Sequence, residues 1–227
     1  MQLEKATLKA MLVAVMAGMA SMTWADPVPC DDPGFRVDTA DVTTHDMICD
    51  AASGAREVLA TCGLTQREPI TIETVKTPVH TIGQCLAAYN CKTGHIQIID
   101  PLLLEENISK DDPYAKLPSE ALFRSLLTHE VAHALVEQNT GDRKMPMVDH
   151  EYIANAMELA ALESRHRKAL LDAAGVEPPV PAEAIDIFIY GLAPRKFAAA
   201  SYLYFEAHGC KTITGILDGT STFQVEH

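Results

Sequence analysis

The segment with the clearest capacity for chemistry is His129-Glu130-Val131-Ala132-His133, in which two histidines are four residues apart. On a helix, this spacing places both imidazoles on one face, about one turn apart, where they can bind a single metal ion. Glu130 is rotated about 100° from His129 and cannot be a third ligand on that face, but its carboxylate can reach a coordinated water. The pattern predicts a zinc site with His129 and His133 as ligands and Glu130 as the general base.

The residues around this motif have the periodicity of an amphipathic helix. We expect a helix from about Glu120 to Gln138 with Ser119 as its N-cap, ended by the Gly and Pro of the following loop. A chance match to a five-residue pattern in such a chain is rare, so we favour a metal site over an ordinary helix surface. The apolar positions that define the stripe are Leu122, Phe123, Leu126, Leu127, Val131, Ala134 and Leu135.

Two histidines leave a catalytic zinc one protein ligand short, because such a site needs three protein donors and an open position for water. The extended pattern His-Glu-x-x-His-x-x-Gly-x-x-His fails here, since Val136 replaces the glycine and Asn139 the third histidine. Glu151, separated from His133 by seventeen residues, begins a second predicted helix. We therefore prefer Glu151 as the third ligand.

Three neighbours compete with Glu151 for this role. His150 is adjacent and is a good zinc donor, Glu158 lies two turns deeper in the same helix, and Asp149 would also supply a carboxylate. Asp149 suits the helix N-cap better than the metal. Glu151 remains the preferred ligand, and His150 and Glu158 stay open as alternatives.

The set His129, Glu130, His133 and Glu151 resembles the gluzincin metallopeptidases, the thermolysin-like and aminopeptidase-like group, over roughly residues 119 to 160. In that group, the two histidines of the motif and a glutamate on the following helix hold the zinc. The resemblance implies a zincin-like fold, a peptide or protein substrate, and hydrolysis by zinc-activated water. A more general likeness is to uncharacterised secreted bacterial proteins with a predicted zincin domain.

The resemblance implies three further features of the site. In several gluzincins an acid four residues after the ligand glutamate binds a ligand histidine; Asn155 stands there in this chain and lacks the charge. A strand beside the site pairs with the substrate backbone, and Gly94–Asp100 is our candidate for it. A further donor stabilises the oxyanion, and the candidates are Tyr190, Tyr202, Tyr204 and His208.

The N-terminal residues 1–25 are typical of a cleavable secretory signal. Lys5 and Lys9 precede an apolar run from Ala10 to Met22, and small residues precede the expected cleavage after Ala25. The run is shorter than the ~20 residues that a membrane-spanning helix requires. An uncleaved N-terminal anchor is the alternative, and we expect no stable membrane insertion of the mature chain.

The remaining composition favours an exported protein. The formal net charge of -13 becomes -14 once the signal, with two lysines and one glutamate, is removed, which disfavours nucleic acid and anionic lipid as partners. All six cysteines follow the signal, so disulfides and a secreted or periplasmic location are expected, although six cysteines allow fifteen pairings. Cys85 and Cys91 flank a short gap that a disulfide could close.

We expect one α+β domain over residues 26–227 with a zincin-like fold. A small, mostly antiparallel sheet from residues 26–118 would lie over the motif helix, and residues 119–227 would be helical. The expected strands are 70–75 and 94–100, with a third within 79–89. Besides the motif helix, helices are expected at 46–62, 149–174, 182–190, 194–208 and 211–217.

Two functions from different classes fit these features. The first is a zinc-dependent peptide hydrolase. The alternative is an inactive zincin-fold protein that binds zinc for structure or recognition, and a weaker possibility is a disulfide-stapled interaction protein with an incidental motif. The histidines outside the motif region have no metal-ligand spacing and are read as surface or capping residues: His45, His80, His95, His166, His208 and His227.

Overall fold

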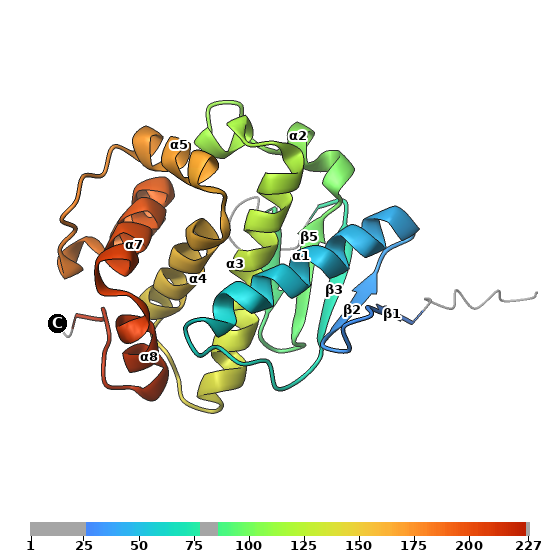
Figure 1. Cartoon of the computed structure of the whole chain (residues 1–227), viewed down its shortest axis with the longest axis horizontal. Coiled ribbons are helices and arrows are strands. Elements are labelled where there is room, and N and C mark those ends of the chain that lie inside the picture. Colours follow the sequence, from blue (N-terminus) through green and yellow to red (C-terminus); the bar gives the residue numbers. More distant parts are fainter. Residues whose placement is uncertain (1–25, 78–85, 226–227) are drawn as a thin grey trace, which may run out of the picture.

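The computed structural model describes residues 26–77 and 86–225 (Figure 1). The predicted signal segment, most of the possible strand 79–89, and Cys85 lie outside these residues. Among the described residues, no helix is both long enough and apolar enough to cross a membrane. The described chain is α+β, with one small sheet and a helical C-terminal half, as expected.

Within the described residues, the sheet has five strands in the spatial order β1-β2-β3-β5-β4. The strands are β1 (Val28–Pro29), β2 (Phe35–Asp38), β3 (Ile70–Val75), β4 (Ala87–Asn90) and β5 (His95–Ile99). The pairs β1–β2 and β4–β5 are antiparallel, whereas β2–β3 and β3–β5 are parallel. The prediction of a mostly antiparallel sheet was therefore wrong. Helix α1 (Val42–Ala60) connects β2 to β3, and such a crossover makes the two strands parallel.

One face of the sheet forms the core. Ile72 of β3 pairs with Ile96 of β5, and both are fully buried beneath the helices. Their neighbours Glu73 and Gln97 point to the opposite face, where they remain partly exposed and hydrogen-bond to each other. This alternation is what a sheet covered on one side only requires.

Helices α3 (Ser119–Thr140) and α4 (Met147–Ala161) pack side by side and carry the predicted site (Figure 1). Helix α3 also contacts α1 and strand β4, and α7 (Pro194–His208) packs on α4. The motif helix is confirmed, but its N-cap is Pro118; the hydroxyl of Ser119 instead donates to Glu105 at 2.6 Å. Both functional helices thus lie between the sheet and the C-terminal helices.

The predicted helix 149–174 is in fact two helices, α4 and α5 (Ser164–Ala174). The chain is extended at Leu162, whose side chain is buried. Arg167 of α5 donates to the carbonyls of Ala160 at 3.1 Å and Leu162 at 2.8 Å, so it satisfies acceptors left free where α4 ends. The residues at this break include no glycine or proline that would mark a helix end, which is why the sequence did not show it.

The remaining helices lie before α3 and after α5. The predicted helix 194–208 is confirmed as α7, and the last predicted helix is α8 (Cys210–Asp218). The predicted helix 182–190 is a 3-10 turn, η3 (Ala182–Ala184), followed by α6 (Ile187–Leu192). Three short elements lie between β5 and α3: η1 (Pro101–Leu103), α2 (Leu104–Asn107) and η2 (Pro113–Lys116).

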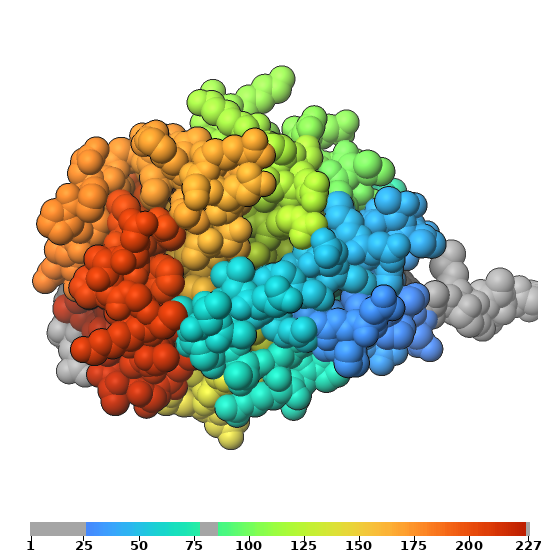
Figure 2. Space-filling view, in the orientation of Figure 1, coloured from blue at the N-terminus to red at the C-terminus, as the bar shows by residue number. Residues whose placement is uncertain are grey.

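Two disulfides join distant segments of the described chain. Cys30 binds Cys49, and Cys62 at the end of α1 binds Cys210 at the start of α8. Figure 2 shows the end of α1 against the C-terminal helices that this second disulfide secures. Cys91 is in neither disulfide, and its expected partner Cys85 lies outside the described residues. The two disulfides suggest an oxidising, extracellular environment.

Candidate metal centre

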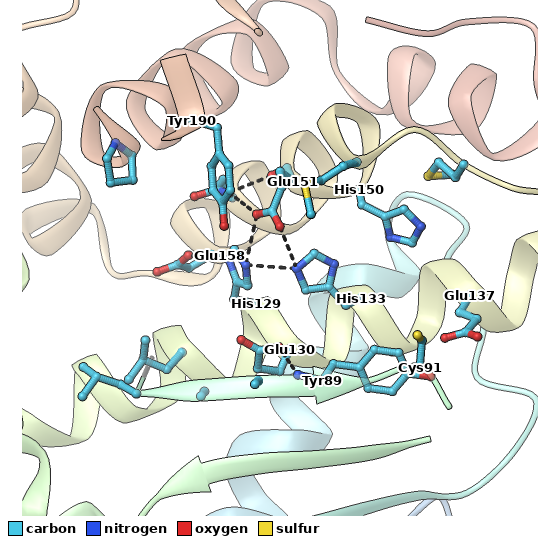
Figure 3. A pocket seen from close by; sticks show the side chains of 18 of the residues that line it. Tyr89, Cys91, His129, Glu130, His133, Glu137, His150, Glu151, Glu158 and Tyr190 are labelled. Carbon is cyan, nitrogen blue, oxygen red and sulfur yellow. Dashed lines mark hydrogen bonds and ion pairs between the residues drawn. The ribbon is translucent and has the colours of Figure 1, made fainter. Parts of the chain in front are cut away.

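The two histidines of the motif and Glu151 converge between α3 and α4 (Figure 3). His129 and His133 lie one turn apart on α3, with their Nε2 atoms 3.1 Å apart. Glu151 enters from α4 with its two oxygens 3.6 Å from Nε2 of His129 and 3.7 Å from Nε2 of His133. The three side chains predicted as ligands are therefore together at one point.

This geometry fits a zinc ion. Ligand atoms about 2.0 to 2.1 Å from a tetrahedral zinc are separated from each other by about 3.3 Å. The two imidazole nitrogens, 3.1 Å apart, are close to that separation, and the two oxygens of Glu151 lie slightly farther away, Oε2 at 3.6 Å from His129 and Oε1 at 3.7 Å from His133. Two imidazole nitrogens and a carboxylate oxygen are also donors that zinc accepts, and three protein ligands leave a fourth position open.

Glu158 holds His129 from the side opposite to this point. Its Oε2 lies 2.9 Å from Nδ1 of His129, and its Oε1 accepts from the Ser125 hydroxyl at 2.5 Å. A carboxylate at Nδ1 keeps the proton there and turns the lone pair of Nε2 toward the metal position. Glu158 is thus outside the group of three and is placed to support the candidate ligand His129, the role for which Asn155 was considered.

Asn155 instead supports Glu151. Its amide donates to the backbone carbonyl of Glu151 at 2.8 Å and lies 3.4 Å from the carboxylate oxygen Oε2. Both side chains are buried. Asn155 therefore restrains the carboxylate and not an imidazole.

Glu130 points away from α4, toward strand β4. Its Oε2 accepts a hydrogen bond of 2.7 Å from the backbone N–H of Tyr89. Strand β4 is the outer strand at this end of the sheet, whereas β5 pairs on both sides, with β3 and β4. The candidate 94–100 for the strand edge beside the site was therefore wrong, and β4 holds that place. Only the possible strand within 79–89 pointed to it in the sequence.

Burial and mutual charge shift the pKa values of these groups in the metal-free protein. Burial raises the pKa of Glu130 to about 7, although His129 and the Tyr89 N–H act in the opposite direction. Burial lowers the pKa of His133 to about 3, so this imidazole is a neutral donor. Burial would also raise the pKa of Glu151, but the hydrogen bond from His129 and the two imidazoles lower it to about 2. An ionised carboxylate and a neutral imidazole are the protonation states that metal ligation requires. Burial would lower the pKa of His129 as well, but its hydrogen bonds to Glu151 and Glu158 raise it well above the ordinary value, so this imidazole must lose a proton when it binds a metal.

The rival ligands lie outside the group of three. The ring of His150 is 5.8 Å from that of His133 between centroids, and it faces the same cavity. Asp149 is almost fully buried and accepts hydrogen bonds from Thr222 and Phe223 near the C-terminus. It is therefore neither a ligand nor the N-cap of α4, which is Pro146.

Of the four candidates for an oxyanion donor, Tyr190 lines the cavity and hydrogen-bonds Glu151 (Figure 3). The hydroxyl of Tyr202 lies 3.0 Å from Glu206 on the same helix. Tyr204 stacks on His208 at 4.0 Å between ring centroids. These last three residues do not line the cavity around the metal position.

The site opens into a cavity of about 880 Å³. It extends along α3 from Leu126 past His133 to Thr140, with β4 on one side and the loop between α3 and α4 on the other. Its volume is in the range of sites that hold small ligands or segments of larger ones. The metal position therefore lies in a cavity that a substrate could enter.

A second group of potential ligands, Cys30, His45 and Cys49, lies near the N-terminal end of α1. The sequence had set His45 aside, yet its Nε2 is 3.7 Å from Sγ of Cys49. Because the two cysteines form a disulfide, they offer no thiolates to a metal. This group is therefore a poorer metal site than the one on α3 and α4.

Comparison with known proteins adds a family but no function. No curated protein and no solved structure matches the chain. A family described as a family of unknown function (DUF6639) matches residues 35–226, which include the whole of α3 and α4. This match covers most of the sequence, and the chain therefore belongs to the DUF6639 family.

Proposed function

We propose that this protein is an exported zinc-dependent peptide hydrolase of the gluzincin type. The observation that carries the proposal is the convergence of His129, His133 and Glu151 within bonding reach of one ion, with Glu130 beside them in the same cavity. The ligand pattern, the helix that follows and the open fourth position agree with the resemblance drawn from the sequence.

When bound, zinc would lower the pKa of a water molecule toward ~7 and polarise the scissile carbonyl. Glu130 would accept the proton of the attacking water and then deliver it to the leaving amine. Its pKa of about 7 in the metal-free protein reflects burial, and a nearby cation would lower that value. Glu158 would keep the His129 ring oriented while the proton moves.

Strand β4 would bind the substrate backbone. The carbonyls of Leu86 and Asn90 accept hydrogen bonds from the β5 side, from Ile99 and Gly94. In an antiparallel pair the intervening residues alternate, so the backbone groups of Ala87 and the carbonyl of Tyr89 face the open side, where the Tyr89 N–H already donates to Glu130. An extended peptide could pair with these groups and place its carbonyl next to Glu130.

Tyr190 is the candidate for the oxyanion donor. It is the one member of the four candidates that lines the cavity, on the α4 side of the metal position. A phenol hydroxyl at this side would donate to the oxyanion as charge develops on it. Substitution of Tyr190 by Phe is expected to reduce the turnover number more than it changes the Michaelis constant.

The location proposed is outside the cytoplasm. Residues 1–25 have the pattern of a cleavable signal, and the disulfides Cys30–Cys49 and Cys62–Cys210 form in oxidising compartments. Secreted and periplasmic locations are both oxidising, so the disulfides fit either one. The identity of the N-terminus of the exported protein, read by mass spectrometry, tests the expected cleavage after Ala25.

The decisive experiment on the function separates metal binding from hydrolysis. Glu130→Gln removes the base but leaves the three ligands, so this variant should bind one zinc per chain and lose at least ~100-fold in hydrolysis of a broad peptide library. Glu120→Gln is the matched control, because it is the same chemical change at an exposed position of the same helix. This control should behave as the wild type.

Two results would contradict the proposal. If the wild-type protein held no zinc after mild purification, the assignment of the metal centre would be wrong. Wild-type protein that holds zinc but cleaves no peptide in the library would favour the alternative, a zinc-binding protein without catalysis. A purely structural zinc site has no need for a base beside its histidines, which is why the enzyme is preferred here.

A further inference from the structure

The segment that follows α8 is bound to the first turn of α4. The carboxylate of Asp149 accepts two hydrogen bonds of 2.7 Å, one from the Thr222 hydroxyl and one from the backbone N–H of Phe223. Asp149 is only 1% exposed, so both of its oxygens are used inside the protein. A buried carboxylate with two short hydrogen bonds is a strong and directional contact.

Aromatic packing reinforces this contact. The ring of Phe223 lies 4.6 Å from that of Tyr152 and 5.3 Å from that of Tyr204, measured between centroids. Tyr152 is on α4, one residue after Glu151, and is fully buried. The segment therefore packs on the same stretch of α4 that supplies the carboxylate ligand.

A second polar contact joins α8 to the loop before α4. Arg143 donates to the carbonyls of Ile216 and Leu217, both at 2.8 Å, at the C-terminal end of α8. Residues of this loop line the cavity, among them Arg143 itself. The loop and the first turn of α4 are thus both held by the C-terminal part of the chain.

The first turn of α4 is packed against α3, with Val148 buried, but it has no side-chain cap. Its N-cap residue, Pro146, makes no side-chain hydrogen bond to the helix. Asp149 lies two residues before Glu151, and the other two ligands belong to α3. The distance from Glu151 to the two imidazoles therefore depends on how firmly this turn is held against α3.

We propose that Asp149 is a positioning residue of the metal centre and that residues 216–223 form a C-terminal clamp, which holds Glu151 at the right distance from His129 and His133. This inference rests on the proposed zinc site. Release of the clamp would let the first turn of α4 move, so that the three ligand atoms would no longer meet at one point. Metal affinity and docking of the C-terminal segment are thereby coupled, and such coupling acts in both directions.

The test compares two substitutions at one position. Asp149→Ala removes both acceptors, whereas Asp149→Asn keeps an acceptor for the Phe223 N–H and a polar group for Thr222. We expect Asp149→Ala to weaken zinc binding about tenfold or more, measured by competition with a chromophoric chelator, and Asp149→Asn to remain close to the wild type. Zinc itself, added to the wild-type protein, should slow amide hydrogen exchange at Phe223.

A control separates positioning from general loss of stability. Asp32 binds Arg56, Ser53 and the backbone N–H of Gly34 in another part of the fold. Asp32→Ala should destabilise the protein without changing zinc affinity, since none of the hydrogen bonds of Asp32 reaches α3 or α4. If the role of Asp149 were purely structural, Asp149→Ala would likewise lose stability and keep its zinc affinity.

The outcomes distinguish this inference from the proposed function. Wild-type protein that binds no zinc would overturn both. Wild-type protein that binds zinc, together with unchanged affinity in Asp149→Ala and unchanged exchange at Phe223, would overturn the clamp and leave the metal centre intact. Should Asp149→Ala fail to fold, the exchange measurement on the wild type decides alone.

Discussion

Glu158 lies seven residues after Glu151, and its carboxylate is 2.9 Å from Nδ1 of His129. The two glutamates of α4 therefore act on the same imidazole from its two sides, Glu151 at Nε2 and Glu158 at Nδ1. Seven residues are two helical turns, so both side chains lie on one face of α4. The imidazole of His129 therefore lies between the two carboxylates.

The first prediction concerns this support. Glu158→Gln removes the charge that holds the Nδ1 proton, so the variant should bind zinc about 10 to 100 times more weakly than the wild type. Chelator competition measures the affinity. The control is Glu163→Gln, an exposed glutamate that contacts Arg165 and lies away from the site. Equal zinc affinity in the two variants would show that Glu158 does not act on His129.

The parts of the site that could be predicted are those that local periodicity determines. The spacing of His129 and His133 places two imidazoles on one helical face whatever the rest of the fold does. The third ligand depends on how α4 packs on α3, which the sequence leaves open among several acids and His150. The contact of Glu158 with His129 was missed because gluzincins support the ligand histidine with an acid four residues after the ligand glutamate. That position is Asn155 in this chain.

The parts of the fold that could not be predicted depend on contacts between distant residues. Parallel pairing of β2 with β3 follows from the path of α1, and strand propensity contains no information on it. The break between α4 and α5 depends on Arg167, which reaches back to carbonyls at the end of α4. The outer position of β4 likewise became visible only from the strand order.

The second prediction decides the third ligand. Glu151→Ala should abolish tight zinc binding, because two imidazoles alone leave the ion poorly held. His150→Ala should retain one zinc per chain, since its ring lies outside the group of three. Metal analysis after dialysis against a weak chelator gives the answer. Zinc loss in His150→Ala with retention in Glu151→Ala would reverse the assignment.

The third prediction compares the two disulfides. Cys62–Cys210 spans 148 residues and Cys30–Cys49 spans 19. In the chain-entropy account, the longer closed loop stabilises the folded state by about 2 kcal/mol more. The double variant Cys62→Ser/Cys210→Ser should therefore lose more unfolding free energy in urea than Cys30→Ser/Cys49→Ser. The reverse order would mean that local packing around Cys30 outweighs loop entropy.

The last prediction uses the pKa of Glu130, which burial raises from 4.5 to about 7 in the metal-free protein. Below pH 4.5 the carboxyl is protonated in both the folded and the unfolded chain, so it has no effect on stability. As pH rises through this interval the unfolded chain loses the proton first, and the metal-free protein becomes less stable. Above pH 7 the cost is complete and amounts to about 3 kcal/mol at most.

Glu130→Gln, which cannot ionise but can still accept from the Tyr89 N–H, should therefore be more stable than the wild type at about pH 8 and similar to it at about pH 4. Urea unfolding with a chelator present measures both. Glu120→Gln, at an exposed position of the same helix, should show no such dependence on pH. If Glu130→Gln destabilised the protein equally at both pH values, the carboxyl would be serving the fold, and its role as a buried base held ready for a metal would lose its physical basis.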